Sequence, residues 1–158
     1  IDSDPCPHHS RHDFPLLTDP EVEWWIRLVS DDRPLGWLLL TDKTAKVVRV
    51  KIEGILSPED AARVRADMNG AVTESRRCFG GARILLNAAE SMVQPQQTFS
   101  QFGNPERLLQ QPGDRVAIVI QSALLKLQAE RALAPVMGNS QLKIFAAAYE
   151  AETWLQAG

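Results

Sequence analysis

The chain has 158 residues, of which 44% are hydrophobic and 23% charged, values that are typical of one globular domain and exclude a disordered or fibrous chain. Seventeen basic residues stand against twenty acidic ones, and the net charge of −3 supplies no positive field, so we expect no nucleic-acid partner. No apolar run approaches the roughly 18 to 20 residues needed to cross a bilayer, and we expect no transmembrane segment.

Residues 1–17 are rich in Pro, His, Asp and Ser and follow neither a helical nor a strand period, which predicts an extended arm. The arm holds one of the two cysteines and all three histidines. Cys6, His8 and His12 are the weak candidates for metal ligands. Prolines beside them disfavour a helix, and no second ligand pair with a recognised spacing occurs elsewhere in the sequence, so we predict no metal site.

Residues 18–35 are predicted to form an N-terminal helix and a connector. Thr18 and Glu21 make a capping box, and apolar residues follow at helical spacing. Alternating Trp24, Ile26 and Leu28 also fit a strand, although the capping box favours the helix.

The stretch GWLLLTDKTAKVVRVKIEG predicts two strands joined by a turn at residues 42–45. Along the second strand apolar and charged residues alternate, so we expect one buried face and one wet face. The apolar set is Val48, Val50 and Ile52, and the charged set is Arg49, Lys51 and Glu53.

Helices and strands then alternate. We predict a helix opened by Ser57 and stopped by Gly80, a second helix opened by Ser122 and kinked or ended at Pro135, and a closing helix at 148–156. Predicted strands lie at 82–87, 115–121 and 141–146. The order predicts an α/β sandwich with a four- to five-stranded, mostly parallel sheet, an N-terminal hairpin and helices packed on the sheet.

One stretch, SMVQPQQTFSQFGNPERLLQQPGD, breaks this regular pattern. Short helices are expected near Pro95 and Pro105, the second capped by Asn104. Phe99 and Phe102 also lie here, next to the strand ends where open α/β sheets place ligands. We therefore predict that segment 91–111 covers an apolar cleft or presents a partner surface. The predicted surface residues are Phe99, Phe102, Met92 and Val93.

Residues 36–158 resemble a STAS-type domain of the SpoIIAA-like group. The resemblance rests on VVRVKIEGILSPED, ARILLN, DRVAIVIQSALLKLQAERALAP and LKIFAAAYEAETWL with its A-x-x-W-L ending. It implies a non-enzymatic regulatory or binding module that binds an apolar small ligand, a lipid or a protein partner. In anti-sigma-factor antagonists of this family a Ser or Thr in a D-S-[ST]-G motif is phosphorylated. Here the matching stretch is LNAAESMVQ, whose only hydroxyl is Ser91, so the alternative is a partner-switching protein with Ser91 as phosphoacceptor.

Catalysis is not expected from this sequence. Beyond His12 the chain has no histidine to serve as a base in a Ser-His-Asp or Cys-His arrangement. Acidic pairs at helix starts are expected to be capping charges, and no phosphate-binding glycine loop follows a strand, so we expect no cofactor.

The chain has only two cysteines, Cys6 and Cys78, which are too few for a disulfide framework and favour a cytoplasmic location. The exposed edge of the hairpin makes a homodimer possible.

Overall fold

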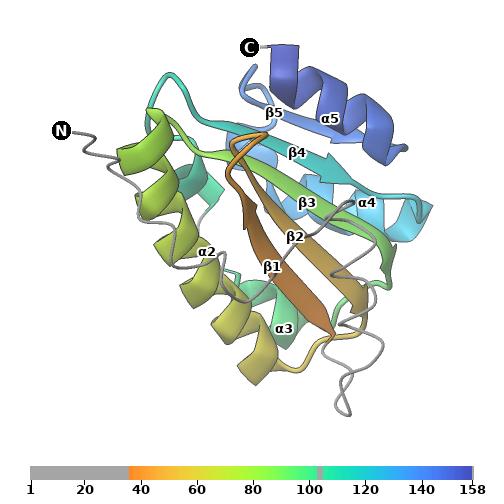
Figure 1. Cartoon of the computed structure of the whole chain (residues 1–158). Coiled ribbons are helices and arrows are strands. Elements are labelled where there is room, and N and C mark those ends of the chain that lie inside the picture. Colours follow the sequence, from red (N-terminus) through yellow and green to blue (C-terminus); the bar gives the residue numbers. More distant parts are fainter. Residues whose placement is uncertain (1–35, 103–104, 158) are drawn as a thin grey trace, which may run out of the picture. The chain divides into compact units, whose positions relative to one another are not determined.

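The computed structural model describes residues 36–102 and 105–157 (Figure 1). Its elements in chain order are β1 (Trp37–Asp42), β2 (Val47–Gly54), α2 (Pro58–Phe79), β3 (Arg83–Ser91), α3 (Gln96–Ser100), the 3₁₀ helix η2 (Pro105–Leu108), β4 (Arg115–Val119), α4 (Ala123–Ala132), the 3₁₀ helix η3 (Ala134–Val136), β5 (Leu142–Phe145) and α5 (Ala148–Ala157). The predicted arm 1–17, the predicted helix and connector 18–35 and the predicted cap Asn104 lie outside the described residues.

The five strands form one sheet in the order β1-β2-β3-β4-β5. β1 and β2 pair as an antiparallel hairpin, with Leu39 opposite Val50. The pairs β2·β3, β3·β4 and β4·β5 are parallel. Parallel neighbours need crossover connections, which α2, the segment with α3 and η2, and α4 provide. The predicted α/β architecture with a mostly parallel sheet and an N-terminal hairpin is therefore confirmed.

Apolar side chains cover both faces of the sheet, as a sandwich requires. One core joins the sheet to α2 and α4 and includes Val50, Val64, Met68, Ile84, Val116, Ile118 and Leu125. A smaller core joins the opposite face to α5 and includes Val47, Leu85, Ala117, Val119, Ala151 and Leu155. The functional site described below belongs to the larger core.

The helix boundaries follow the predicted capping residues. The Ser57 hydroxyl accepts a hydrogen bond from the Asp60 amide (3.0 Å), which satisfies one of the unpaired amides of the first turn of α2. Gly80 ends α2 in the left-handed region, with φ of 78°. Ser122 caps α4 by accepting from the Leu125 amide (3.2 Å). α4 then gives way at Leu133 to a 3₁₀ turn containing Pro135, because proline cannot donate the next helical hydrogen bond.

The expectation of a wet face along β2 is wrong for Arg49 and Lys51, which are only 8% and 6% exposed. Arg49 forms ion pairs with Asp42 of β1 (3.3 Å) and with Glu152 of α5. A charged side chain can be buried at low cost when carboxylates accept its hydrogen bonds. Strand alternation alone therefore misassigned this face, since it shows neither the neighbouring strand that carries Asp42 nor the distant helix that carries Glu152.

Candidate functional site

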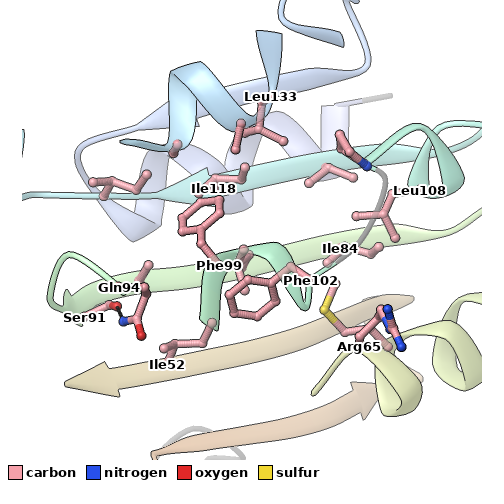
Figure 2. A pocket seen from close by; sticks show the side chains of 18 of the residues that line it. Ile52, Arg65, Ile84, Ser91, Gln94, Phe99, Phe102, Leu108, Ile118 and Leu133 are labelled. Atoms are coloured by element: carbon pink, nitrogen blue, oxygen red, sulfur yellow. Dashed lines mark hydrogen bonds between the residues drawn. The ribbon is translucent and has the colours of Figure 1, made fainter. Parts of the chain in front are cut away.

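An apolar cavity of about 380 Å³ lies within the larger core (Figure 2). The sheet forms its floor, α2 and α4 form its sides, and α3 with η2 lies across it. Its volume falls in the range of small-molecule sites, roughly 300 to 1,000 Å³. The cavity therefore occupies the place where the sequence shows its least regular segment.

Most residues that line the cavity are aliphatic or aromatic, and ten of them are also buried members of the core. The strands contribute Ile52, Ile84, Leu86, Ala88, Ser91, Val116, Ile118 and Leu142, with Ile120 just after β4. The helices and their connections contribute Arg65, Met68, Asn69, Gln94, Gln96, Phe99, Ser100, Phe102, Pro105, Arg107, Leu108, Leu125, Ala129, Ala132 and Leu133. Such a surface recognises a ligand mainly by excluding water from apolar groups.

Phe99 and Phe102 lie in the middle of this lining. Their rings meet edge to face with centroids 5.7 Å apart, an arrangement that aromatic pairs prefer. The fully buried Thr98 holds α3 in place by donating its hydroxyl proton to the Leu56 carbonyl (3.0 Å). Both rings are half-buried, and both face the cavity (Figure 2).

Ser91 and Gln94 close one end of the cavity. The two N–H groups of the buried Gln94 amide are shared among three acceptors, the Gly54 carbonyl (2.9 Å), the Met92 carbonyl (2.9 Å) and the Ser91 hydroxyl (3.0 Å). Its oxygen accepts from the Leu56 amide (2.9 Å). These bonds use all the hydrogen-bonding groups of the Gln94 side chain except one oxygen lone pair. Gln94 was not predicted as a site residue, because a glutamine in a Gln-rich loop has no pattern that marks it as buried.

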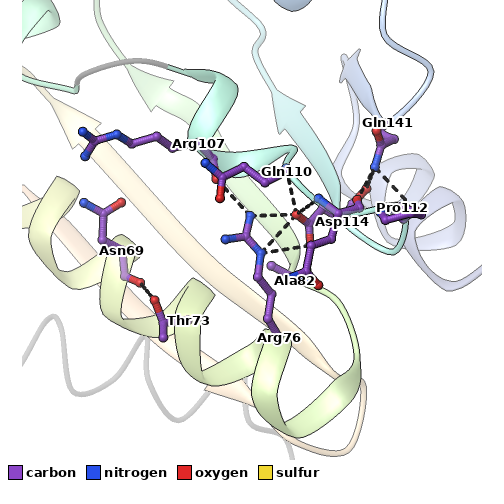
Figure 3. Close-up of polar contacts among 10 residues, drawn as sticks. Asn69, Thr73, Arg76, Ala82, Arg107, Gln110, Pro112, Asp114 and Gln141 are labelled. Atoms are coloured by element: carbon purple, nitrogen blue, oxygen red, sulfur yellow. Dashed lines mark hydrogen bonds and ion pairs between the residues drawn. The ribbon is translucent and has the colours of Figure 1, made fainter.

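Arg65, Asn69 and Arg107 lie at the opposite end of the cavity, where both arginines are exposed. Figure 2 shows Arg65 of α2 beyond Phe102, and Figure 3 shows the Arg107 side chain of η2 extending toward Asn69 of α2. A hydrogen bond from the Arg76 guanidinium of α2 to the Arg107 carbonyl (2.9 Å) holds η2 in position. The lining at this end is polar and its two arginines are exposed to solvent, and we call it the open end.

Arg76 is itself held by Asp114, which is fully buried (Figure 3). The carboxylate of Asp114 accepts from the Arg76 guanidinium (2.7 Å) and from the backbone amides of Ala82 (2.8 Å), Gln110 (3.1 Å) and Gln111 (2.9 Å). Burial alone would raise the pKa of Asp114, but the hydrogen bonds from Arg76, Ala82 and Gln111 hold it below its ordinary value. Asp114 is therefore a charged structural centre beside the cavity.

The other predicted site residues are placed differently. Met92 and Val93 are exposed and do not line the cavity. Ser91 ends β3, is 8% exposed, and donates its hydroxyl toward the carbonyls of Met92 (3.2 Å) and Gly54 (3.4 Å). The weak metal candidates Cys6, His8 and His12 lie outside the described residues, and among the described residues no group of three or more His, Cys, Asp or Glu could hold a metal ion.

A solved structure of an uncharacterised protein from Shewanella loihica, of the DUF3478 family and described as having a SpoIIAA-like fold, is similar to this chain with a TM-score of 0.52. The two are 18% identical, and the match covers 79% of this chain and 98% of that protein. Neither the protein-family models nor the curated sequences gave a match. In residues 36–102 and 105–157, no helix is long and apolar enough to cross a membrane.

The chain therefore contains a domain with a SpoIIAA-like fold, as its sequence predicted. At this level of identity the likeness concerns the fold, and the chemistry of the site has to be argued from the residues of this chain.

Proposed function

We propose that this domain is a non-enzymatic binding module that holds an apolar small molecule in the cavity beneath α3 and η2. The observation that carries the proposal is the cavity itself, a volume of about 380 Å³ lined mainly by aliphatic and aromatic side chains of the core. Protein cores normally pack without voids larger than a water molecule. A ligand whose apolar part fills this volume gives these side chains the contacts they otherwise lack.

In closed protein cores each Å³ left empty costs about 24 cal/mol, so any part of this volume that water does not enter destabilises the folded state. Water entering from the open end lowers that cost but gains few hydrogen bonds from apolar walls. An apolar ligand is the occupant that the lining favours.

The proposal is tested by filling the cavity with a side chain. Ala88 of β3 is buried and faces the cavity, so Ala88→Leu should occupy part of the space. We expect decan-1-ol to raise the Tm of the wild-type protein, because a ligand that binds only the folded state stabilises it. The Tm shift should fall at least severalfold in Ala88→Leu. The control is Ala134→Leu in η3, an exposed position outside the cavity, which should respond like the wild type. An equal shift in all three proteins would show that the probe binds elsewhere.

The alternative is a phosphorylation-controlled partner-switching protein with Ser91 as phosphoacceptor. A kinase would first have to expose this hydroxyl, which is buried and already donates to a backbone carbonyl. The cavity proposal assigns the Ser91 hydroxyl a structural role, so Ser91→Ala should lower the free energy of unfolding by about 1 kcal/mol through the loss of its internal hydrogen bond. A phosphoserine at residue 91 in the native protein, found by mass spectrometry, would favour the alternative.

A further inference from the structure

The charges that line the cavity all have one sign. Arg65 and Arg107 are the charged members of the lining, and no aspartate or glutamate contributes to it. The chain as a whole carries a net charge of −3, so two cations with no carboxylate among the described residues that line the cavity are a local departure from the average. Arg65 lies on α2 and Arg107 on η2, and Figure 3 shows the Arg107 side chain extending toward Asn69, which is one helical turn from Arg65 on α2.

Neither guanidinium is neutralised within the part of the chain that the structure describes. Arg49 and Arg76 form ion pairs with carboxylates, whereas the side chains of Arg65 and Arg107 form none with any described residue. A guanidinium has five N–H donors in a planar fork that matches a carboxylate. The open end therefore offers unused donors together with uncompensated positive charge.

The closed end, at Ser91 and Gln94, has few free hydrogen-bonding groups for a ligand. The amide N–H groups of Gln94 are already shared among three oxygens, and the Ser91 hydroxyl proton already points toward backbone carbonyls. A polar ligand group placed there would have to displace these internal bonds, which is unfavourable in a buried site. The two ends of the cavity thus define a direction for the ligand, with its apolar end toward Ser91 and its polar end toward Arg65.

We propose that the ligand is an amphipathic monoanion, an inference that rests on the proposed function. Its carboxylate lies between Arg65 and Arg107, and its apolar chain extends past Phe99 and Phe102. The volume sets the scale of the molecule. The cavity of about 380 Å³ lies near the lower end of the range of small-molecule sites, roughly 300 to 1,000 Å³, so the ligand should be small. A medium-chain fatty acid has this size and this distribution of polarity.

The test compares three probes with the same ten-carbon chain: decanoate, decan-1-ol and decyltrimethylammonium. Their dissociation constants would be measured by calorimetry, below the concentrations at which the probes aggregate. We expect decanoate to bind the wild-type protein about tenfold more tightly than decan-1-ol, because each exposed ion pair contributes modestly, and the cationic probe to bind most weakly. The preference for decanoate should shrink at high salt, since the two guanidinium groups are screened by ions.

The double variant Arg65→Gln with Arg107→Gln should lose the preference for decanoate while keeping its affinity for decan-1-ol. The matched control is Arg131→Gln, which removes an exposed arginine of α4 that does not line the cavity and should keep the preference. Equal binding of decanoate and decan-1-ol to the wild type would overturn this inference and leave the proposed function standing. Binding of none of the three probes would overturn both.

Discussion

Asp114 is the residue on which the surroundings of the cavity depend most directly. Its carboxylate joins the last turn of α2 through Arg76, the start of β3 through Ala82, and the loop before β4 through Gln110 and Gln111. Because Arg76 also holds the carbonyl of Arg107, the same centre positions η2 over the cavity. A buried carboxylate is stable only when its hydrogen bonds are satisfied, and here backbone amides and a guanidinium satisfy them.

Asp114→Asn should lower the free energy of unfolding at neutral pH by about 3 kcal/mol, because it leaves Arg76 partly buried without its counter-charge. The wild-type protein should also lose stability in acid. Since the folded-state pKa of Asp114 lies below the unfolded value of about 3.9, its contribution is complete above that pH and is lost as the pH falls through the folded-state pKa. Urea unfolding between pH 7 and pH 3 measures both effects.

The free energy of unfolding of Asp114→Asn should depend less on pH over the acid range than that of the wild type, because the titrating carboxyl group has been removed. Parallel curves for the two proteins would mean that other carboxylates carry the acid sensitivity and that the Asp114 pair contributes little.

Some site residues carry a local signal in the sequence and others do not. Phe99 and Phe102 could be selected because large apolar side chains are conspicuous in a Gln-rich segment. Gln94 and Thr98 could not, because their importance comes from burial against Gly54 and Leu56, which are distant in sequence. Arg65 and Arg107 likewise become notable only when the fold brings α2 and η2 to the same opening.

Among the elements, the turn from α2 into β3 makes a close contact with the loop before β4. A Cβ atom at Gly81 would lie 2.5 Å from the Gly113 carbonyl oxygen, so no larger side chain fits without moving backbone. Gly81→Ala should lower the free energy of unfolding by about 2 kcal/mol. Gly70→Ala is the matched control within α2, where a Cβ meets nothing within 4 Å. It should raise stability by about 0.5 to 1 kcal/mol, since alanine favours helix over glycine.

Thermal or urea unfolding of the two glycine variants gives the comparison directly. Equal effects of the two substitutions would show that the α2–β3 turn can shift away from the β4 loop, contrary to the tight packing described here.

At the same scale, element type and order could be predicted from the sequence because caps and apolar periods are local signals. Ser57, Gly80 and Ser122 act as predicted. The continuation of β3 to Ser91 was not predicted, because it depends on pairing with Gly54 of β2 rather than on an apolar run. The burial of Arg49 was missed for the same reason, since Glu152 lies far along the chain.

For the molecule as a whole, the sequence indicated where a site would lie but not its shape. Irregular sequence between β3 and β4 marked the crossover that has only the short helices α3 and η2 to cover the sheet. A cavity forms where side chains from several elements leave a space between them unfilled. The periodicity of one segment therefore does not predict the volume of the cavity. The binding role proposed here depends on that volume being occupied in the native protein.

The most direct measurement is native mass spectrometry of the full chain purified from cells without detergent. We predict a folded species heavier than the sequence mass by one small organic molecule, which is released by organic extraction and absent or much reduced in Ala88→Leu but retained in Ala134→Leu. A wild-type protein that carries only its sequence mass, and whose Tm is not raised by decanoate or decan-1-ol, would contradict the account.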